Sequence, residues 1–297
     1  MHGAAWLLDR MPELVRTDYL LTEVAMLPMP TPGGPRFLLG AAEKGPFWKT
    51  IRTRGTPGHG SAPYGADNAV VTIAEIATRL AAYKPRARVT EIWRRFVAGL
   101  GLPEGQAAAL TDPAALDRAI AGMASEAPGL ARTVHACTHL TISPNVIAGG
   151  TKVNMIADAA SLTVDIRALP GDTEADVEAI LRDALGDLYD RVEISDDGVA
   201  TAASESPLDT PLWDAVVATT RAIRPDGEVI PAMHTVTTDA RFFRRHGTVC
   251  YGYGIFDDAM DFTTFQGMFH GNDERVSVAS LGLCAEFFTQ VPSRLWA

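Results

Sequence analysis

The sequence lacks the features that mark secreted, membrane-spanning and cysteine-bound metal proteins. It has three cysteines, Cys137, Cys250 and Cys284, which are widely spaced and form no C-x-x-C pair. We therefore expect three buried thiols in a reducing compartment. No apolar stretch approaches the ~18–20 residues of a membrane-spanning helix, and the first residues include no basic leader with a cleavage site. These absences predict a cytoplasmic protein with no membrane partner.

Positive charge is also scarce. Lysine and arginine number 26 against 36 aspartates and glutamates, so the formal net charge is −10 at pH 7. No Lys/Arg-rich run occurs, which argues against a nucleic-acid partner. Metal cations or small solutes fit this acidic balance better. The chain is long enough for one large domain or two ordinary ones.

Several catalytic motifs are missing as well. The sequence contains no serine nucleophile elbow, no phosphate-binding loop and no dinucleotide fingerprint. The segment "GHGSA" (Gly58–Ala62) has the wrong spacing for G-x-S-x-G, and Pro57 and Pro63 oppose the strand–turn–helix that this motif requires. Serine-hydrolase, nucleotidase and dinucleotide-dependent functions are therefore not indicated.

Hydrophobic spacing predicts a βαββαβ order within residues 47–203, the ferredoxin-like arrangement. Alternating or apolar runs predict strands, and helical spacing predicts two helices, the first capped by Asp67 or Asn68. The strands are expected at 47–55, 135–150, 153–171 and 191–197, and the helices at 66–83 and 172–188. Residues 84–133 do not belong to this pattern and are expected to form an inserted helical excursion.

The flanking segments alternate strand and helix, which is typical of a layered α/β sheet. Residues 204–297 contain too few strands for a sheet alone, so residues 1–46 are expected to supply more. The predicted fold is α/β: a layered domain from 1–46 and 204–297, interrupted by a ferredoxin-like unit at 47–203 with its insertion at about 84–133.

His59 stands out in "GTPGHGSAPYGADN" (Gly55–Asn68), where it lies between Gly58 and Gly60. Glycine permits close backbone approach and proline fixes φ, so this frame presents one imidazole in a turn instead of packing it in a core.

Other polar residues are candidates for binding. His270, in "GMFHGNDERVS", and Glu23, at the end of an apolar run, are residue types that bind metal ions, and Glu274 could orient His270. A surface-loop histidine and a solvent-facing strand end remain the alternatives. Asn154 and Arg167 share a strand-like run and suit a carboxylate, although an ion pair explains Arg167 equally.

Asp239 lies at a loop-to-helix junction in "TTDARFF". Thr237 or Thr238 could cap this helix, so local capping explains the segment without any functional role.

Taken in order, four segments resemble the co-catalytic metallopeptidases that include aminoacylase, succinyl-diaminopimelate desuccinylase, acetylornithine deacetylase and the carboxypeptidase G and S types. The segments are "EKGPFWKTIRTRGTPGHGSAPYGADNAV", "PNVIAGGTKVNMIADAASLTVDIRALPGDT", "TTDARFFRRHG" and "FHGNDERVSV". The resemblance implies a catalytic α/β domain interrupted by a lid that forms a homodimer. It also implies hydrolysis of a linear amide, in an N-acyl amino acid or peptide, with two zinc ions.

Carried over to this sequence, the resemblance implies metal ligation by Glu23 and His270. Asp239 and Glu274 are our candidates for supporting those ligands from a second layer of contacts. His59 matches a lid histidine that reaches the partner subunit's site and polarises the scissile carbonyl.

The same resemblance makes Asn154 and Arg167 the lid pair that holds the substrate's carboxylate. The usual glycine after Glu23 is replaced by Val24.

The chain departs from the family pattern because it contains no H-x-D motif, no bridging aspartate after it and no adjacent Glu-Glu pair. Two ligands are too few for zinc, which normally takes three or four protein ligands. We therefore expect a truncated amidohydrolase, inactive alone or completed by another chain. The alternative is a non-catalytic dimerisation or binding protein.

Overall fold

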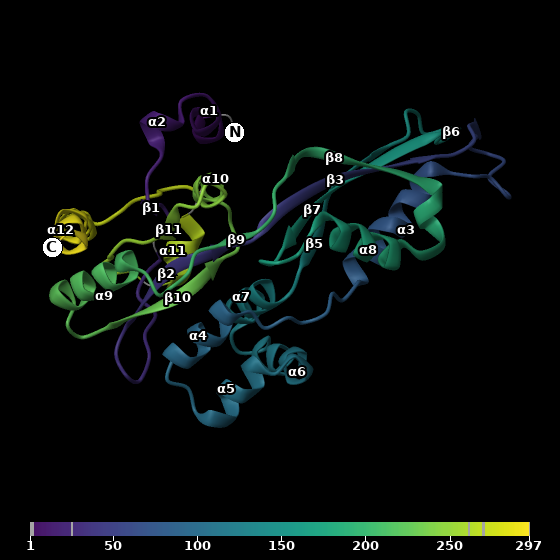
Figure 1. Ribbon diagram of the computed structural model, residues 1–297. Helices are drawn as coiled ribbons and strands as arrows, with labels where there is room; N and C mark the ends of the chain where they lie inside the picture. Colours follow the sequence, from purple (N-terminus) through teal and green to yellow (C-terminus); the bar gives the residue numbers. More distant parts are fainter. Residues whose placement is uncertain (1–2, 25, 261, 269–270, 297) are drawn as a thin grey trace. The chain divides into compact units, whose positions relative to one another are not determined.

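The computed structural model describes residues 3–24, 26–260, 262–268 and 271–296, without the side chains of 262, 263 and 266. The chain forms two units, which Figure 1 shows as ribbons. The first unit comprises residues 1–43, 89–137 and 204–297, and the second comprises 44–88 and 138–203. The fold is α/β, as the sequence predicts. Most of the segment 84–133, expected as an excursion from the second unit, groups with the first.

The second unit is an antiparallel sheet with two helices on one face. Its strands follow the order β5 (Thr141–Gly149), β7 (Ala159–Ala168), β3 (Gly45–Arg54) and β8 (Val192–Ala200). The helices are α3 (Ala69–Ala82) and α8 (Glu174–Leu185), and the 3-10 helix η1 (Gly186–Arg191) follows α8. This is the predicted ferredoxin-like lid.

Strand β7 shows why this sheet forms. Every second residue from Ala160 to Ala168 is buried, and the residues between them are half-buried. Because side chains alternate across a strand, one face packs on the helices and the other remains available for polar groups. The buried face includes Leu162, Val164 and Ile166, which belong to the same core as the buried residues of α3 and α8.

Both lid helices begin at residues that cap them. Asn68 accepts a hydrogen bond from the Val70 backbone N–H, so of the two predicted caps the structure selects Asn68. Thr173 and Asp176 form a reciprocal capping box at the start of α8. Each cap satisfies backbone N–H groups that have no partner within the helix.

The first unit contains a mixed sheet in the order β1 (Tyr19–Thr22), β11 (Val249–Gly252), β2 (Arg36–Glu43) and β10 (Glu228–His234), with β9 (Ser204–Glu205) also paired to β2. β1 is parallel to β11 and β2 is parallel to β10. β11 and β2 meet in an antiparallel sense at the pair Gly252 and Gly40.

The remaining helices belong wholly or mostly to the first unit. They are α1 (Gly3–Arg10), α2 (Pro12–Val15), α4 (Glu91–Gly99), α5 (Glu104–Thr111), α6 (Pro113–Met123), α7 (Pro128–Thr138), α9 (Pro211–Ile223), α10 (Ala240–Arg244), α11 (Phe262–Met268) and α12 (Val278–Leu295). Phe96 of α4 and the following Leu100 pack on Leu38 and Ile230 of the sheet. This contact places the helical segment in the first unit.

Two other expectations can be compared with the structure. Cys137 and Cys250 are buried as expected, whereas Cys284 is only half-buried. Within the described parts of the chain, no helix is both long enough and apolar enough to cross a membrane.

Candidate functional site

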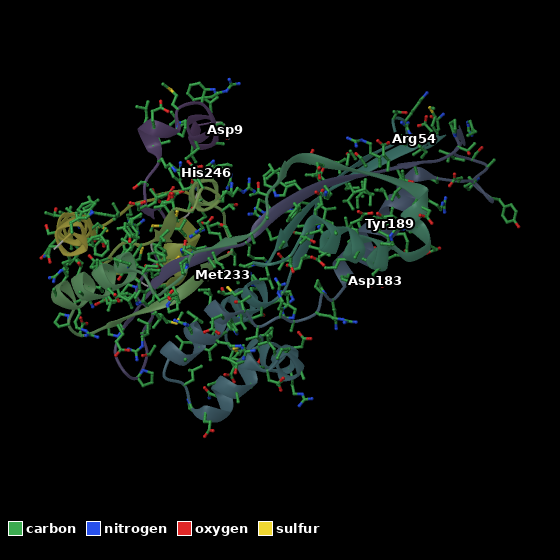
Figure 2. The ribbon with its side chains drawn as sticks, in the orientation of Figure 1. Asp9, Arg54, Asp183, Tyr189, Met233 and His246 are labelled. Atoms are coloured by element: carbon green, nitrogen blue, oxygen red, sulfur yellow. The ribbon has the colours of Figure 1, made fainter. Side chains whose placement is uncertain are left out.

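His59 lies on a short ribbon of two strands, β4 (Gly58–His59) and β6 (Met155–Ile156). The ribbon follows directly from the paired strands β3 and β7, and Arg54, labelled in Figure 2, is the last residue of β3. His59 is opposite Met155 in the ladder, and the Gly60 N–H donates a 2.8 Å hydrogen bond to the Asn154 carbonyl. The imidazole is exposed, as its glycine and proline frame predicts.

The His59 ring is oriented by its neighbour Ser61. The Ser61 backbone N–H donates to His59 Nδ1 at 3.2 Å, and the Ser61 hydroxyl lies 2.8 Å from the same nitrogen. Because Nδ1 accepts from the backbone, a neutral ring carries its proton on Nε2. His59 therefore presents an N–H donor.

Arg167 lies near the end of β7, on the face away from the helices. Its Nε donates to Asp165 Oδ1 at 2.7 Å and its Nη2 donates to Oδ2 at 3.1 Å. Trp48 Nε1 donates to the same Oδ1 at 3.0 Å. The structure thus shows the ion pair that the sequence left as an alternative role for Arg167.

Asn154 and Arg167 are not brought together within one chain. Asn154 is exposed in the turn before β6, next to the His59 ribbon. Arg167 lies eight residues beyond Ala159, the first residue of β7, which corresponds to about 26 Å of extended strand at ~3.3 Å per residue. Only His59 and Asn154 are neighbours among the three lid residues.

Glu23 follows β1 in the first unit and is exposed. Its carboxylate accepts a short hydrogen bond from the Thr22 hydroxyl. The next residue, Val24, has φ of 73°. This left-handed conformation costs an L-residue about 1–2 kcal/mol but costs glycine nothing. This conformation favours glycine, the residue that the resemblance implies at this position, over the valine that is present.

The remaining candidates show no shared site. Asp239 and Glu274 are exposed in the first unit, and His270 lies outside the described residues. Asp239 makes no capping bond within the described structure; instead the Thr238 hydroxyl accepts from the Ala240 N–H at 3.1 Å. The sequence had offered Thr238 as one of two possible caps.

The described residues do not provide a metal site. Among them, no three His, Cys, Asp or Glu side chains lie close enough together to bind one ion. Among the described residues, the Glu23 carboxylate is hydrogen-bonded to the Thr22 hydroxyl and lies in no group of three such ligands. Since zinc requires three or four protein ligands, the side chains described here do not fit the two-zinc centre that the resemblance implies.

A buried charged cluster in the first unit was not predicted from the sequence. Glu43, the last residue of β2, is 1% exposed. It accepts hydrogen bonds from the Thr238 N–H at 3.0 Å and the Thr238 hydroxyl, and it pairs with Arg244 Nη1 at 3.2 Å. The only sequence signal was a glutamate ending an apolar run, because its partners lie about two hundred residues away.

His234 ends β10, directly after Met233, which Figure 2 labels. It is buried, and its Nε2 has no hydrogen-bond partner among the described residues. Burial, together with the nearby Arg244 guanidinium, lowers the pKa of His234 to about 4, so the ring is neutral near pH 7.

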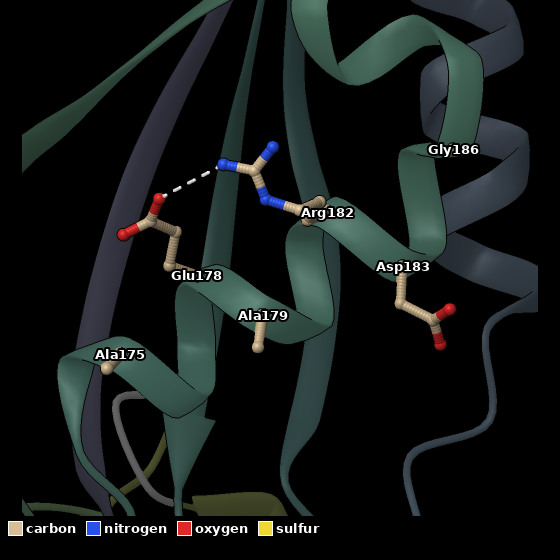
Figure 3. A pocket seen from close by; sticks show the side chains of 6 residues that line it. All are labelled: Ala175, Glu178, Ala179, Arg182, Asp183 and Gly186. Carbon is tan, nitrogen blue, oxygen red and sulfur yellow. Dashed lines mark ion pairs between the residues drawn. The ribbon is translucent and has the colours of Figure 1, made fainter.

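A shallow concavity follows the outer face of α8, and Figure 3 shows its lining. Glu178 and Arg182 form an ion pair of 3.5 Å across one helical turn. Ala175, Ala179, Asp183 and Gly186 complete the surface. None of the predicted site residues lies in it, and exposed pairs of this kind contribute little binding energy.

Comparisons with known proteins agree with this fold. The sequence matches the M20 family model described as "Peptidase dimerisation domain" over residues 41–193, just over half of the chain. A search of curated proteins found no match.

Solved structures with a similar fold include several peptidases. An M20 family metallo-carboxypeptidase from Sulfolobus solfataricus aligns with TM-score 0.65 and 14% identity, covering 97% of this chain and 67% of that one. Human carnosine dipeptidase 1 aligns with TM-score 0.61 and 13% identity, covering 98% and 62%. Aminopeptidase PepT from Bacillus cereus aligns with TM-score 0.59 and 14% identity, covering 100% and 62%. The chain thus spans about three-fifths to two-thirds of the length of these structures.

Proposed function

Because the chain belongs to the M20 peptidase family, through the dimerisation domain that occupies just over half of it, we propose that it serves the hydrolysis of a linear amide bond. The substrate class is an N-acyl amino acid or a peptide with a free C-terminus. The observation that carries this proposal is the exposed His59 imidazole, held by Ser61 with its proton on Nε2.

The chemistry proposed for His59 is electrophilic. An amide carbonyl becomes an oxyanion as a nucleophile attacks it, and a donor held in place stabilises that charge by ~2.7–4 kcal/mol. His59 Nε2–H supplies such a donor, presented at the end of the β4–β6 ribbon. The imidazole would act on a carbonyl in the site of a second copy, as the family resemblance implies.

The substrate's carboxylate is proposed to bind Asn154 and Arg167. These residues are separated by at least the eight-residue span from Ala159 to Arg167, about 26 Å of strand. A small ligand that contacts both must therefore take one residue from each of two copies. This requirement supports a homodimer as the functional form.

The exposed edge of the lid sheet is the proposed dimer interface. As far as the structure describes the chain, β5 lies at the sheet edge, with Val146 59% and Ile147 55% exposed. Val71 of the adjacent α3 is 64% exposed. An unpaired edge strand flanked by apolar side chains is a template for pairing with a second copy about a two-fold axis.

Charge at this edge is expected to prevent dimerisation. We expect the wild-type chain to elute at twice its 31.7 kDa mass, and the double variant Val146→Lys, Ile147→Lys to elute as a monomer, because two copies would then oppose four lysines across the interface. Light scattering after gel filtration measures both masses. Val236→Lys, at a similarly exposed site in the first unit, is the matched control and should remain dimeric. A monomeric wild type, or a dimeric double variant, contradicts this interface.

We propose that the 297 residues by themselves bind the N-acyl amino acid or peptide but do not hydrolyse its amide bond. No three-ligand group occurs among the described residues, and the sequence contains neither H-x-D nor adjacent glutamates. After equilibration with zinc and extensive dialysis, we expect less than one zinc per chain by elemental analysis. We also expect no cleavage of N-acetyl amino acids or dipeptides with added zinc. Stoichiometric, tightly held zinc or turnover would contradict this proposal.

A non-catalytic dimerisation or binding protein is the second candidate, favoured by the same lack of a three-ligand group. The hydrolase and the non-catalytic protein are distinguished by mixing this chain with a separately expressed segment that carries H-x-D and Glu-Glu motifs. Hydrolysis that appears only in the mixture, and is lost in His59→Ala, supports the hydrolase. A mixture without activity supports the binding protein.

A further inference from the structure

Asp165, Arg167 and Trp48 meet on the face of the lid sheet that the helices leave uncovered. Asp165 and Arg167 are two residues apart on β7, so their side chains emerge on the same face. In the ladder between β3 and β7, Trp48 is directly opposite Asp165. Cross-strand neighbours of this kind are close enough for side-chain hydrogen bonds.

The contacts fix the plane of the Arg167 guanidinium. Asp165 engages one edge of the guanidinium, through Nε at 2.7 Å and Nη2 at 3.1 Å. Trp48 Nε1 donates to the same carboxylate at 3.0 Å, and the guanidinium carbon lies 6.0 Å from the Trp48 ring centroid. The Asp165 carboxylate therefore accepts hydrogen bonds from both Trp48 and Arg167, and it links the two side chains.

Partial burial distinguishes the Arg167–Asp165 pair from an ion pair on the open surface. The side chains of Arg167 and Asp165 are 23% and 28% exposed, so both are largely removed from water. A free arginine side chain samples many rotamers, and a bidentate carboxylate restricts that freedom before any ligand arrives. Arg167 is thus prepared in one orientation.

We propose that Asp165 is a positioning residue for Arg167, with Trp48 holding Asp165 in turn. This inference rests on the proposed role of Arg167 in binding a substrate carboxylate. Asp165 itself touches no substrate; its carboxylate sets the direction in which the guanidinium faces.

The first test reads the orientation directly and needs no ligand. The Arg167 Nε–Hε resonance, assigned by its loss in Arg167→Lys, should be protected from solvent exchange in the wild type because Nε donates to Asp165. Asp165→Asn should speed its exchange at least about ten-fold, since a charge-assisted bond becomes a neutral one. Asp196→Asn, which removes a carboxylate paired with Lys49 in the same unit, is the matched control and should leave the resonance unchanged. An unchanged resonance in Asp165→Asn overturns the proposal.

The second test measures binding of N-acetylglycine against N-acetylglycinamide, which lacks the carboxylate. We expect Asp165→Asn to weaken N-acetylglycine binding about ten-fold, equal to 1.4 kcal/mol, with N-acetylglycinamide binding unaffected. Trp48→Phe, which keeps the ring but removes Nε1–H, should give a smaller loss. If Arg167→Lys fails to weaken N-acetylglycine binding, the proposed function of Arg167 is wrong. If Arg167→Lys weakens binding and Asp165→Asn does not, only the positioning role is wrong.

Discussion

Alanine at position 40 is expected to destabilise the first unit strongly. Its Cβ would lie 1.7 Å from His234 Nε2 and 2.2 Å from His234 Cδ2, far inside van der Waals contact. His234 is buried and Gly40 is paired with both β10 and β11, so neither side can yield without breaking the sheet. We expect Gly40→Ala to cost about 3 kcal/mol, the upper end of the usual range for overpacking and a large part of the 5–15 kcal/mol that stabilises a typical domain. Thermal unfolding followed by circular dichroism measures this loss.

Two further variants test the cause. Gly40→Ala combined with His234→Ala should be more stable than Gly40→Ala alone, because the new methyl group then occupies space that the imidazole has left. Gly105→Ala in α5 is the control: an added Cβ there meets nothing within 4 Å, and alanine favours the helix by up to ~1 kcal/mol. A Gly40→Ala protein that unfolds at the wild-type temperature would show that the imidazole moves aside without cost.

The second large effect is expected from Arg244→Met. The Arg244 and Glu43 side chains are 4% and 1% exposed. Arg244 also donates to the Ser206 and Ser204 hydroxyls and to the Cys250 carbonyl. Removing the guanidinium leaves a buried carboxylate without the cation it contacts, and breaking buried pairs in this way costs about 3–5 kcal/mol. Chemical denaturation at pH 7 gives the free energy of unfolding of the variant.

A double-mutant cycle separates the pair from the packing. Glu43→Gln with Arg244→Met should recover part of the loss, because the remaining group is then uncharged. Arg95→Met provides the control, since Arg95 and Glu91 form an exposed pair one turn apart in α4, worth below ~0.5 kcal/mol. Equal losses in Arg95→Met and Arg244→Met would show that burial does not govern these pairs.

The lid was predictable because its sequence carries local periodicity. The alternating burial of β7 and the Asn68 cap of α3 follow from residue spacing over ten or fewer positions. The unit to which residues 89–137 belong was not predictable in this way. Phe96 packs on the cluster that contains Ile230, more than a hundred residues away. Helical spacing predicts that one face of a helix is buried, but it does not identify the element against which that face packs.

The exposure of a candidate site residue was predictable where neighbouring glycines and prolines shape the backbone around it. The glycines and prolines around His59 indicated an exposed imidazole, and the structure has one. The Glu43–Arg244 pair could not be foreseen, because nothing local joins residues two hundred positions apart. Asp165 was missed although it lies two residues before Arg167, because its role depends on Trp48 across the strand pair.

The pairing of β3 with β7, followed along the chain by the pairing of β4 with β6, has a thermodynamic consequence. These are two separate ladders that follow one another along the chain: Arg167 is opposite Pro46 near one end of the β3–β7 ladder, and His59 is opposite Met155 in the β4–β6 ladder. The eight-residue span from Ala159 to Arg167 alone corresponds to about 26 Å of extended strand, which is longer than a dipeptide. A small molecule that contacts both must therefore join two chains. By mass action, its apparent affinity then rises with protein concentration, and the ligand and the second chain each strengthen the binding of the other.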